Sequence, residues 1–436
     1  MKKLVIIGNG IAGTTLARWV RKLSDFEIEM VSDESPLFYS RTALMYIFMG
    51  DVKLQDTYGY PEVFFEKNNI KLIHARAEHI DTTQKTILLK KEGTSFETSY
   101  DYLVIATGSK PTFYNWPNQN AKGVQGFYHL DDLQELEENA KHAKNAVLVG
   151  GGLIGIELAE MLQRRAINTY FLIREKWYWN GVLPDCDAQL LTSYIAEECP
   201  GLALETSLDK IEVNTQNEVI GVTTTTGESI ACDLVGIATG VHPNIDWLKE
   251  TSIETDKGVL INAHFETNIK DVFAIGDCAQ HKMPPKDRRN VEAVWYTGRI
   301  MGETLARHLC LEPSVYAPGP WFNSAKFFEL EYQTYGLVSS DRMKKENEIH
   351  FQCVLDSTNH KWITIALDQN NNTFLGINSF GIRLRHEVFE QWLIEKKTSD
   401  FIVNNMTKAL FDPEFFKDYS QDIQKAYKRY KNEKNI

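Results

Sequence analysis

Two glycine-rich turns, each placed between an apolar strand and a helix, predict an α/β protein with two Rossmann-like domains. The first strand is Lys3–Ile7, which runs through the turn Gly8–Gly13 into a helix at Ile11–Leu23. A second strand, Phe26–Val31, follows that helix. The same order returns about 140 residues later, so the chain contains an internal duplication.

The second copy has the same elements in the same order. The strand Asn145–Val149 leads through the turn Gly150–Gly155 into a helix at Leu153–Arg165, and the strand Asn168–Ile173 comes next. Further strand-like stretches follow each copy, at Lys71–Ile73, Thr86–Lys90, Tyr102–Ala106, Leu202–Thr226 and Leu234–Ala238.

The character of the chain changes after Ala317-Pro318-Gly319-Pro320. Alternating segments at Ile349–Leu355, Trp362–Leu367 and Thr373–Ile377 predict a smaller α+β domain. From Ser399 the sequence predicts two helices, the second with an apolar stripe at Phe416, Tyr419, Ile423, Ala426, Tyr427 and Tyr430. Tyrosines and mixed charges in this stripe favour packing on the protein's own body over lipid anchoring.

These borders predict a first domain in two parts, residues 1–125 and 241–317. It would enclose a second domain at 126–240, and an α+β domain at 318–398 and a helical tail at 399–436 would follow. A chain of 436 residues is long enough for several cores.

Composition excludes several function classes. The net charge of −12 argues against nucleic-acid binding. Six scattered cysteines form neither a C-x-x-C pair nor a metal-ligand cluster, so we expect a reduced, cytoplasmic protein without a metal site. No apolar run approaches 18 residues, and Met1–Ile7 reads as a strand instead of a signal peptide, so a membrane location is not expected.

The glycine turns have the spacing of dinucleotide sites. Gly8 permits the tight turn, Gly10 lets the backbone approach a pyrophosphate, and Gly13 permits close packing of helix on strand. Asp33, at the end of the next strand, can accept hydrogen bonds from ribose hydroxyls. The second turn repeats this spacing with Gly150, Gly152 and Gly155.

Three further segments carry a family resemblance. Asp101–Gly108, Leu234–Gly240 and Thr267–Asp277 resemble signatures of the pyridine nucleotide–disulfide oxidoreductase superfamily, and the resemblance spans Met1 to about Leu311. It implies bound FAD, with Asp277 on the ribitol and a helix starting near Asn290 aimed at the flavin. The FAD residues that it implies are Gly8, Gly10, Gly13, Asp33, Thr107, Gly108, Gly276 and Asp277.

Within the superfamily, Pro36–Leu44 resembles ferredoxin and rubredoxin reductases and the N-terminal part of assimilatory nitrite reductases. Arg41 matches an arginine that lies against FAD in that group, the alternative being a solvated surface arginine. Pro320–Ser324 resembles the start of the group's C-terminal domain, with Asn323 in place of its second tryptophan.

Other departures concern the chemistry. A lysine that is common near flavin N5 is here Tyr46, and no cysteine lies beside the expected flavin, so dithiol and sulfenate chemistry lack their sulfur. Cys278 is expected to be a packing residue. Glu157 would lie near the nicotinamide–flavin contact, so Glu157 and Tyr46 are the candidate catalytic residues. A glutamate favoured by the helix dipole is the alternative for Glu157.

The second nucleotide site also suggests a donor. Ile173 stands where an acidic residue would select NADH, and Arg174 follows it, which favours NADPH over NADH. A shift of one residue in register would instead bring Glu175 to the ribose.

The resemblance implies an enzyme that passes hydride from NAD(P)H to FAD and electrons to a ferredoxin-like or rubredoxin-like carrier or a partner enzyme. Lys282, Lys286, Arg288 and Arg289 could dock an acidic carrier. The alternatives are an NAD(P)H oxidase, a quinone or small-molecule reductase, and a flavin-based redox sensor or interaction protein. The resemblance implies that a homodimer is possible, because the family's C-terminal domain often helps to form dimers, but the sequence leaves the oligomeric state open.

Overall fold

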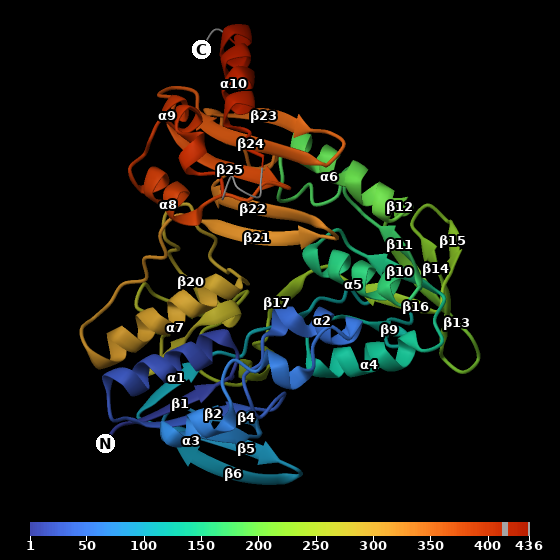
Figure 1. Cartoon of the computed structure of the whole chain (residues 1–436). Coiled ribbons are helices and arrows are strands. Elements are labelled where there is room, and N and C mark those ends of the chain that lie inside the picture. The colour runs from blue at the N-terminus through green and yellow to red at the C-terminus, as the bar shows by residue number, and fades with distance from the viewer. Residues whose placement is uncertain (412–416, 435–436) are drawn as a thin grey trace. The chain divides into compact units, whose positions relative to one another are not determined.

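The computed structural model describes residues 1–411 and 417–434 and divides the chain into two compact units. Unit 1 comprises residues 1–113, 126–139 and 240–318, and unit 2 comprises residues 114–125, 140–239 and 319–436. Each unit contains one of the duplicated strand–turn–helix motifs, which confirms the predicted α/β class (Figure 1). The finer division into five segments stays a prediction.

Unit 1 is built on a parallel sheet with the strand order β19-β7-β1-β2-β3. Its strands are β1 Lys3–Ile7, β2 Glu27–Ser32, β3 Ile70–His74, β7 Tyr102–Ile105 and β19 Val272–Ala274. Ile7 lies opposite both Val31 and Ile105, so the carboxyl ends of the central strands meet at one edge. The central strands are buried on both faces, which their continuous apolar sequence predicts.

Two helices of unit 1 lie against each other, α1 Ile11–Leu23 and α7 Trp295–Cys310 (Figure 1). A Cβ at Gly302 would lie 2.5 Å from the Ala12 carbonyl oxygen, so only glycine permits this approach. The prediction that α7 begins near Asn290 was wrong by several residues. Val294 is extended, and the Glu292 carboxylate accepts hydrogen bonds from Arg288 and Thr297, which holds the preceding segment out of the helix.

The other elements of unit 1 surround this framework. The antiparallel sheet β4-β5-β6 contains Arg76–Asp81, Thr86–Lys91 and Thr94–Ser99. The two-stranded pairs are β8 Ser109–Pro111 with β17 Val241–Pro243, and β18 Val259–Ile261 with β20 Ala279–His281. The remaining helices are α2 Leu44–Met49, α3 Glu62–Lys67 and α4 Leu130–Ala140.

Unit 2 repeats the parallel sheet with the order β12-β11-β10-β16-β9. Its strands are β9 Val124–Gln125, β10 Asn145–Val149, β11 Asn168–Leu172, β12 Gly201–Ala203 and β16 Leu234–Ile237. Helix α5 Leu153–Arg164 follows β10, and α6 Asp185–Glu198 precedes β12. An antiparallel sheet of β13 Leu208–Val213, β14 Val219–Thr224 and β15 Ser229–Ala231 completes this half.

The C-terminal half of unit 2 is an antiparallel sheet in the order β21-β22-β25-β24-β23. Its strands are β21 Phe322–Phe327, β22 Leu330–Gly336, β23 Glu348–Asp356, β24 Lys361–Asp368 and β25 Phe374–Phe380. Helices α8 His386–Ile394, α9 Ser399–Asn404 and α10 Ser420–Lys434 follow them.

The C-terminal tail packs on this sheet. Ile423 and Tyr427 of α10 are buried, and the Tyr427 ring lies 5.1 Å from that of Phe351 on β23. The apolar stripe therefore faces protein, which confirms the prediction, although Phe416 lies outside the described residues. In the described part of the chain, none of the helices combines the length and the apolar character that crossing a bilayer requires.

A buried carboxylate joins α6 to the C-terminal sheet. Asp187 has no exposed surface, and its oxygens accept hydrogen bonds from four side chains of three strands. The donors are Gln352 (3.1 Å), Trp362 (3.0 Å), Thr364 (2.5 Å) and Asn378 (2.9 Å). Burial raises the pKa of Asp187, and the four donors oppose that shift. A buried carboxyl group with four hydrogen-bond donors from the sheet fixes the helix on the sheet.

Candidate dinucleotide-binding sites

The first glycine turn has the shape of a pyrophosphate cradle. Gly8 has a φ of +111°, and a Cβ there would lie 2.1 Å from the Ala106 carbonyl oxygen. A Cβ at Gly13 would lie 2.1 Å from the Gly8 carbonyl oxygen, whereas one at Gly10 would have nothing within 4 Å. Two glycines are thus required by packing, and the space beside Gly10 is open to a ligand at the amino end of α1.

The second turn in unit 2 has the same geometry. Gly150 has a φ of +115°, and a Cβ there would lie 2.4 Å from the Ala238 carbonyl oxygen. A Cβ at Gly155 would lie 2.8 Å from the Gly150 carbonyl oxygen, whereas the nearest atom to one at Gly152 is 3.7 Å away. The Tyr178 hydroxyl donates to the Gly152 carbonyl and ties the turn down (2.8 Å).

In unit 1 the predicted FAD residues follow neighbouring parallel strands. Gly8 follows β1, Thr107 follows β7, and Gly276 follows β19, so all three lie at the carboxyl edge of one sheet. A Cβ at Gly276 would lie 3.0 Å from the Ala12 Cβ, which places this glycine against the start of α1. Ligands of open parallel sheets bind at this edge, so the residues present fit the ADP and ribitol parts of FAD.

Asp277 of unit 1 has two hydroxyl partners. Its Oδ2 atom accepts hydrogen bonds from the Ser109 and Tyr128 hydroxyls, each at 3.2 Å. Burial raises the pKa of Asp277, and these two donors oppose the shift. Cys278, the next residue, is fully buried, and its thiol lies within hydrogen-bonding distance of backbone carbonyl oxygens, as expected of a packing residue.

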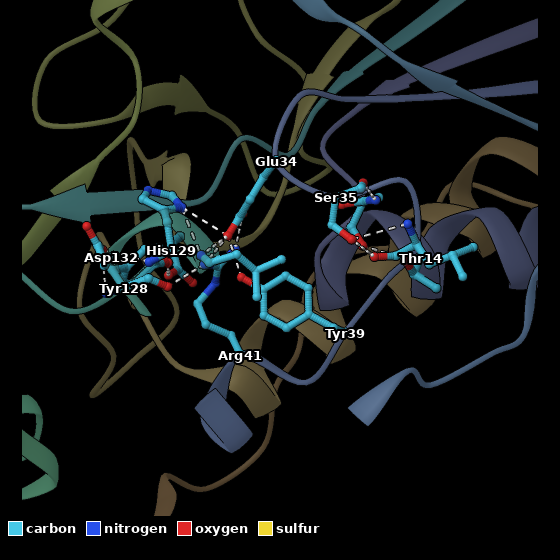
Figure 2. A network of polar contacts seen from close by, with 12 residues as sticks. Thr14, Glu34, Ser35, Tyr39, Arg41, Tyr128, His129 and Asp132 are labelled. Atoms are coloured by element: carbon cyan, nitrogen blue, oxygen red, sulfur yellow. Dashed lines mark hydrogen bonds and ion pairs between the residues drawn. The ribbon is translucent and has the colours of Figure 1, made fainter. Parts of the chain in front are cut away.

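The loop after β2 holds Arg41 in an ion pair (Figure 2). Asp33 is exposed, whereas the neighbouring Glu34 binds the Arg41 guanidinium through two hydrogen bonds of 2.7 and 3.0 Å. The guanidinium also donates to the Tyr128 carbonyl oxygen, and its Cζ lies 4.5 Å from the centre of the Tyr128 ring. Burial alone would raise the pKa of Glu34, but hydrogen bonds from His129 and Arg41 hold it well below its usual range.

The residues around Arg41 could not be recognised from the motifs, because Glu34, Tyr128 and His129 belong to none of them. Glu34 also accepts from the Tyr39 hydroxyl and from the Leu130 N–H (3.1 Å) at the start of α4. Whether Arg41 also touches the cofactor stays a prediction. An acidic residue directly after the expected Asp33 was the only available hint.

Glu157 lies in the first turns of α5. It is half-buried, and no hydrogen bond or ion pair of its carboxylate is found within residues 1–411 and 417–434. Burial raises its pKa to about 7, and the charge of Glu160 adds to the shift. Glu160 in turn pairs with Lys326 of β21 (2.9 Å). Tyr46, the other candidate catalytic residue, is 37% exposed on α2.

Arg174 follows β11, where the adenosine ribose is expected. Its side chain is 76% exposed and pairs with Glu175 at 2.9 Å. The ion pair raises the pKa of the guanidinium, and it places an acid and a base side by side at this strand end.

The expected docking cluster differs from the prediction. The Arg288 side chain is only 5% exposed and pairs with Glu292 at 2.6 Å, so its assignment to a surface cluster was wrong. Lys282 pairs with Glu254, whereas Lys286 and Arg289 are exposed. Buried charges need a partner, and Glu292, four residues on, supplies it.

Comparisons with known proteins now identify the class. The family model described as pyridine nucleotide-disulphide oxidoreductase matches residues 2–299, so the chain belongs to this family. Its members are FAD-dependent oxidoreductases that use NADH or NADPH, which confirms the expected enzyme class and cofactors.

Two relatives and one solved structure are similar to this chain over most of its length. The assimilatory nitrate reductase electron transfer subunit of Bacillus subtilis (strain 168) is 29% identical over 72% of this chain, which spans 39% of that longer protein. The NADH-rubredoxin oxidoreductase of Clostridium acetobutylicum is 31% identical over 93% of this chain and 99% of its own length. An NAD-dependent persulfide reductase from A. fulgidus shares the fold, with a TM-score of 0.87, 20% identity, and coverage of 99% of this chain and 84% of that one.

Proposed function

We propose that this chain is an NADPH-dependent, FAD-containing reductase whose electron acceptor is a small acidic redox protein of the rubredoxin or ferredoxin kind. The observation that carries the proposal is the duplicated glycine cradle, one per unit, in which a Cβ would meet nothing within 4 Å at Gly10 and only an ordinary contact of 3.7 Å at Gly152. When bound, FAD would accept a hydride from the nicotinamide and pass electrons to the acceptor. The full-length match to a rubredoxin reductase supports the acceptor class.

The protein's own residues have distinct tasks in this proposal. The turn at Gly8–Gly13 and the Asp277 carboxylate would hold FAD, and the turn at Gly150–Gly155 would hold the nicotinamide dinucleotide. Glu157 and Tyr46 are the residues proposed to border the reacting rings. Arg174 would pair with the 2′-phosphate of NADPH.

A basic loop is the proposed dock for the carrier. Lys286 and Arg289 are exposed, and Met283 beside them is 84% exposed, so the loop offers charge and an apolar contact together. The chain as a whole has a net charge of −12, so a local positive site is needed to attract an acidic partner.

The test uses the purified, flavin-loaded protein. Reversal of the two charges, Lys286→Glu with Arg289→Glu, should lower the rate of rubredoxin reduction about tenfold at low salt and leave ferricyanide reduction unchanged. The matched control, Lys67→Glu with Lys91→Glu, makes the same charge change at exposed positions elsewhere on unit 1. Equal loss in both double variants, or equal loss with ferricyanide, would exclude the dock.

An oxidase is the second candidate, because an NADH oxidase of Methanocaldococcus jannaschii is 30% identical over 64% of this chain and 63% of its own length. Steady oxygen consumption without any carrier, at a rate matching that with rubredoxin, would favour the oxidase over the carrier reductase.

A further inference from the structure

Tyr128 contacts three separate parts of unit 1, and Figure 2 shows it beside Arg41 and Asp132. Its carbonyl oxygen accepts from Arg41 of the loop after β2, and its ring faces the same guanidinium. Its hydroxyl donates to Asp277 after β19 (3.2 Å). Its N–H donates to Asp132 Oδ2 at the start of α4 (2.7 Å). The carbonyl oxygen and the ring therefore share Arg41 as their partner, whereas the N–H and the hydroxyl bind Asp132 and Asp277.

The hydroxyl of Tyr128 is close to two residues that are expected to bind FAD. Besides its bond to Asp277, it would lie 3.7 Å from a Cβ built on Gly108. Gly108 directly follows Thr107 at the carboxyl end of β7. The hydroxyl therefore lies at the carboxyl edge of the sheet, beside the residues that are expected to bind FAD.

The donors around Asp277 are arranged on one side of its carboxylate. Ser109 and Tyr128 both donate to Oδ2, and neither of these two hydroxyls donates to Oδ1. A carboxylate whose one oxygen is held by two hydroxyls cannot rotate without breaking both hydrogen bonds. The arrangement presents the other oxygen in a fixed direction.

We propose that Tyr128 is a positioning residue for the flavin, an inference that rests on the proposed FAD site. The Tyr128 hydroxyl orients Asp277 toward a ribitol hydroxyl of FAD. The Arg41–Glu34 pair holds the Tyr128 ring and carbonyl, so the hydroxyl is itself held in place. The residue acts through Asp277 and takes no part in hydride transfer.

The test removes the hydroxyl alone. Tyr128→Phe keeps the ring over Arg41 and all main-chain contacts, and it should speed FAD release from the diluted, flavin-loaded protein about five- to tenfold, followed as the rise in flavin fluorescence. The thermal unfolding midpoint should change little. Tyr316→Phe is the matched control, because the buried Tyr316 hydroxyl has no hydrogen-bond partner in the part of the chain that the structure describes.

A double-mutant cycle separates positioning from a general structural role. In an Asp277→Ala background, Tyr128→Phe should add almost nothing to FAD release, since its partner is gone. Full additivity of the two changes, release at the wild-type rate, or an unfolding midpoint that falls in step with release would each overturn the inference. A colourless wild-type protein that FAD cannot reconstitute would instead end the proposed function, so the two failures are distinguishable.

Discussion

Glu157→Gln should stabilise the protein in a strongly pH-dependent way. Glu157 is half-buried on α5, where burial first and the Glu160 charge second raise its pKa from 4.5 to about 7. Glutamine has nearly the same shape and no charge, so the substitution removes the cost of ionising this carboxyl in the folded state.

The magnitude and the sign follow from linkage. A rise from 4.5 to about 7 corresponds to about 3 kcal/mol at roughly 1.4 kcal/mol per unit. Because the folded pKa lies above the unfolded one, the folded state keeps its proton between these values while the unfolded state loses it. The free energy of unfolding therefore falls as pH rises through this window. Glu157→Gln should match wild type near pH 4.5 and exceed it by up to about 3 kcal/mol above pH 7.

The assay is urea unfolding of the flavin-loaded protein at pH 5 and pH 8, followed by far-UV circular dichroism. Glu346→Gln, an exposed glutamate of the same unit, is the control and should behave as wild type at both values. A stability difference between Glu157→Gln and wild type that is the same at pH 5 and pH 8 would refute the reasoning. If Glu157 also borders the nicotinamide, an ionisation near pH 7 should disappear from the pH profile of kcat/KM.

Three further predictions test the sites and the fold. Gly8→Ala should lower the unfolding midpoint strongly, because its Cβ would lie 2.1 Å from a carbonyl oxygen, whereas Gly10→Ala, with nothing within 4 Å, should fold normally and lose FAD absorbance; equal losses of fold would contradict the cradle. Glu175→Gln should raise the ratio of kcat/KM for NADPH to that for NADH about tenfold, and Arg174→Ala should lower this ratio. If neither substitution changes the ratio, Arg174 and Glu175 do not lie at the ribose site. Asp187→Asn replaces an oxygen that accepts hydrogen bonds with an NH2 group that faces donors, so it should lower the free energy of unfolding by about 3 kcal/mol. An unchanged free energy of unfolding would mean that the carboxyl is protonated in the wild-type protein.

The nucleotide-binding elements could be predicted from sequence because their determinants are local. The helix expected at Ile11–Leu23 has those same bounds, and the helix expected at Leu153–Arg165 ends one residue earlier. A buried parallel strand reads as a continuous apolar run, and glycines are required where the backbone passes a neighbouring carbonyl group. In each copy, the apolar strand and the glycines of the turn lie within about fifteen residues of each other along the chain.

The Asp187 node could not be predicted, because its determinants are far apart. An aspartate in the first turn of a helix ordinarily interacts with the helix dipole at the surface, and α6 begins at Asp185. The four donors to Asp187 come from 165 to 191 residues further along the chain. Tyr128 was missed for the same reason, since its partners Arg41 and Asp277 lie 87 and 149 residues away.

The sequence around Arg41 and Arg288 does not decide whether these charged side chains are exposed or held in ion pairs. Arg41 was expected against FAD, which stays a prediction, and its ion pair is with Glu34, seven residues away. Arg288 was expected in an acidic-carrier dock but is buried in an ion pair with Glu292, four residues away. Both glutamates were visible in the sequence, but chain proximity does not say which side chain turns inward. A buried, paired arginine contributes little long-range field, whereas an exposed one steers a partner. In the proposed docking, the attraction of an acidic carrier would come from Lys286 and Arg289, whereas the paired arginines hold the loops beside Tyr128 and α7 in place.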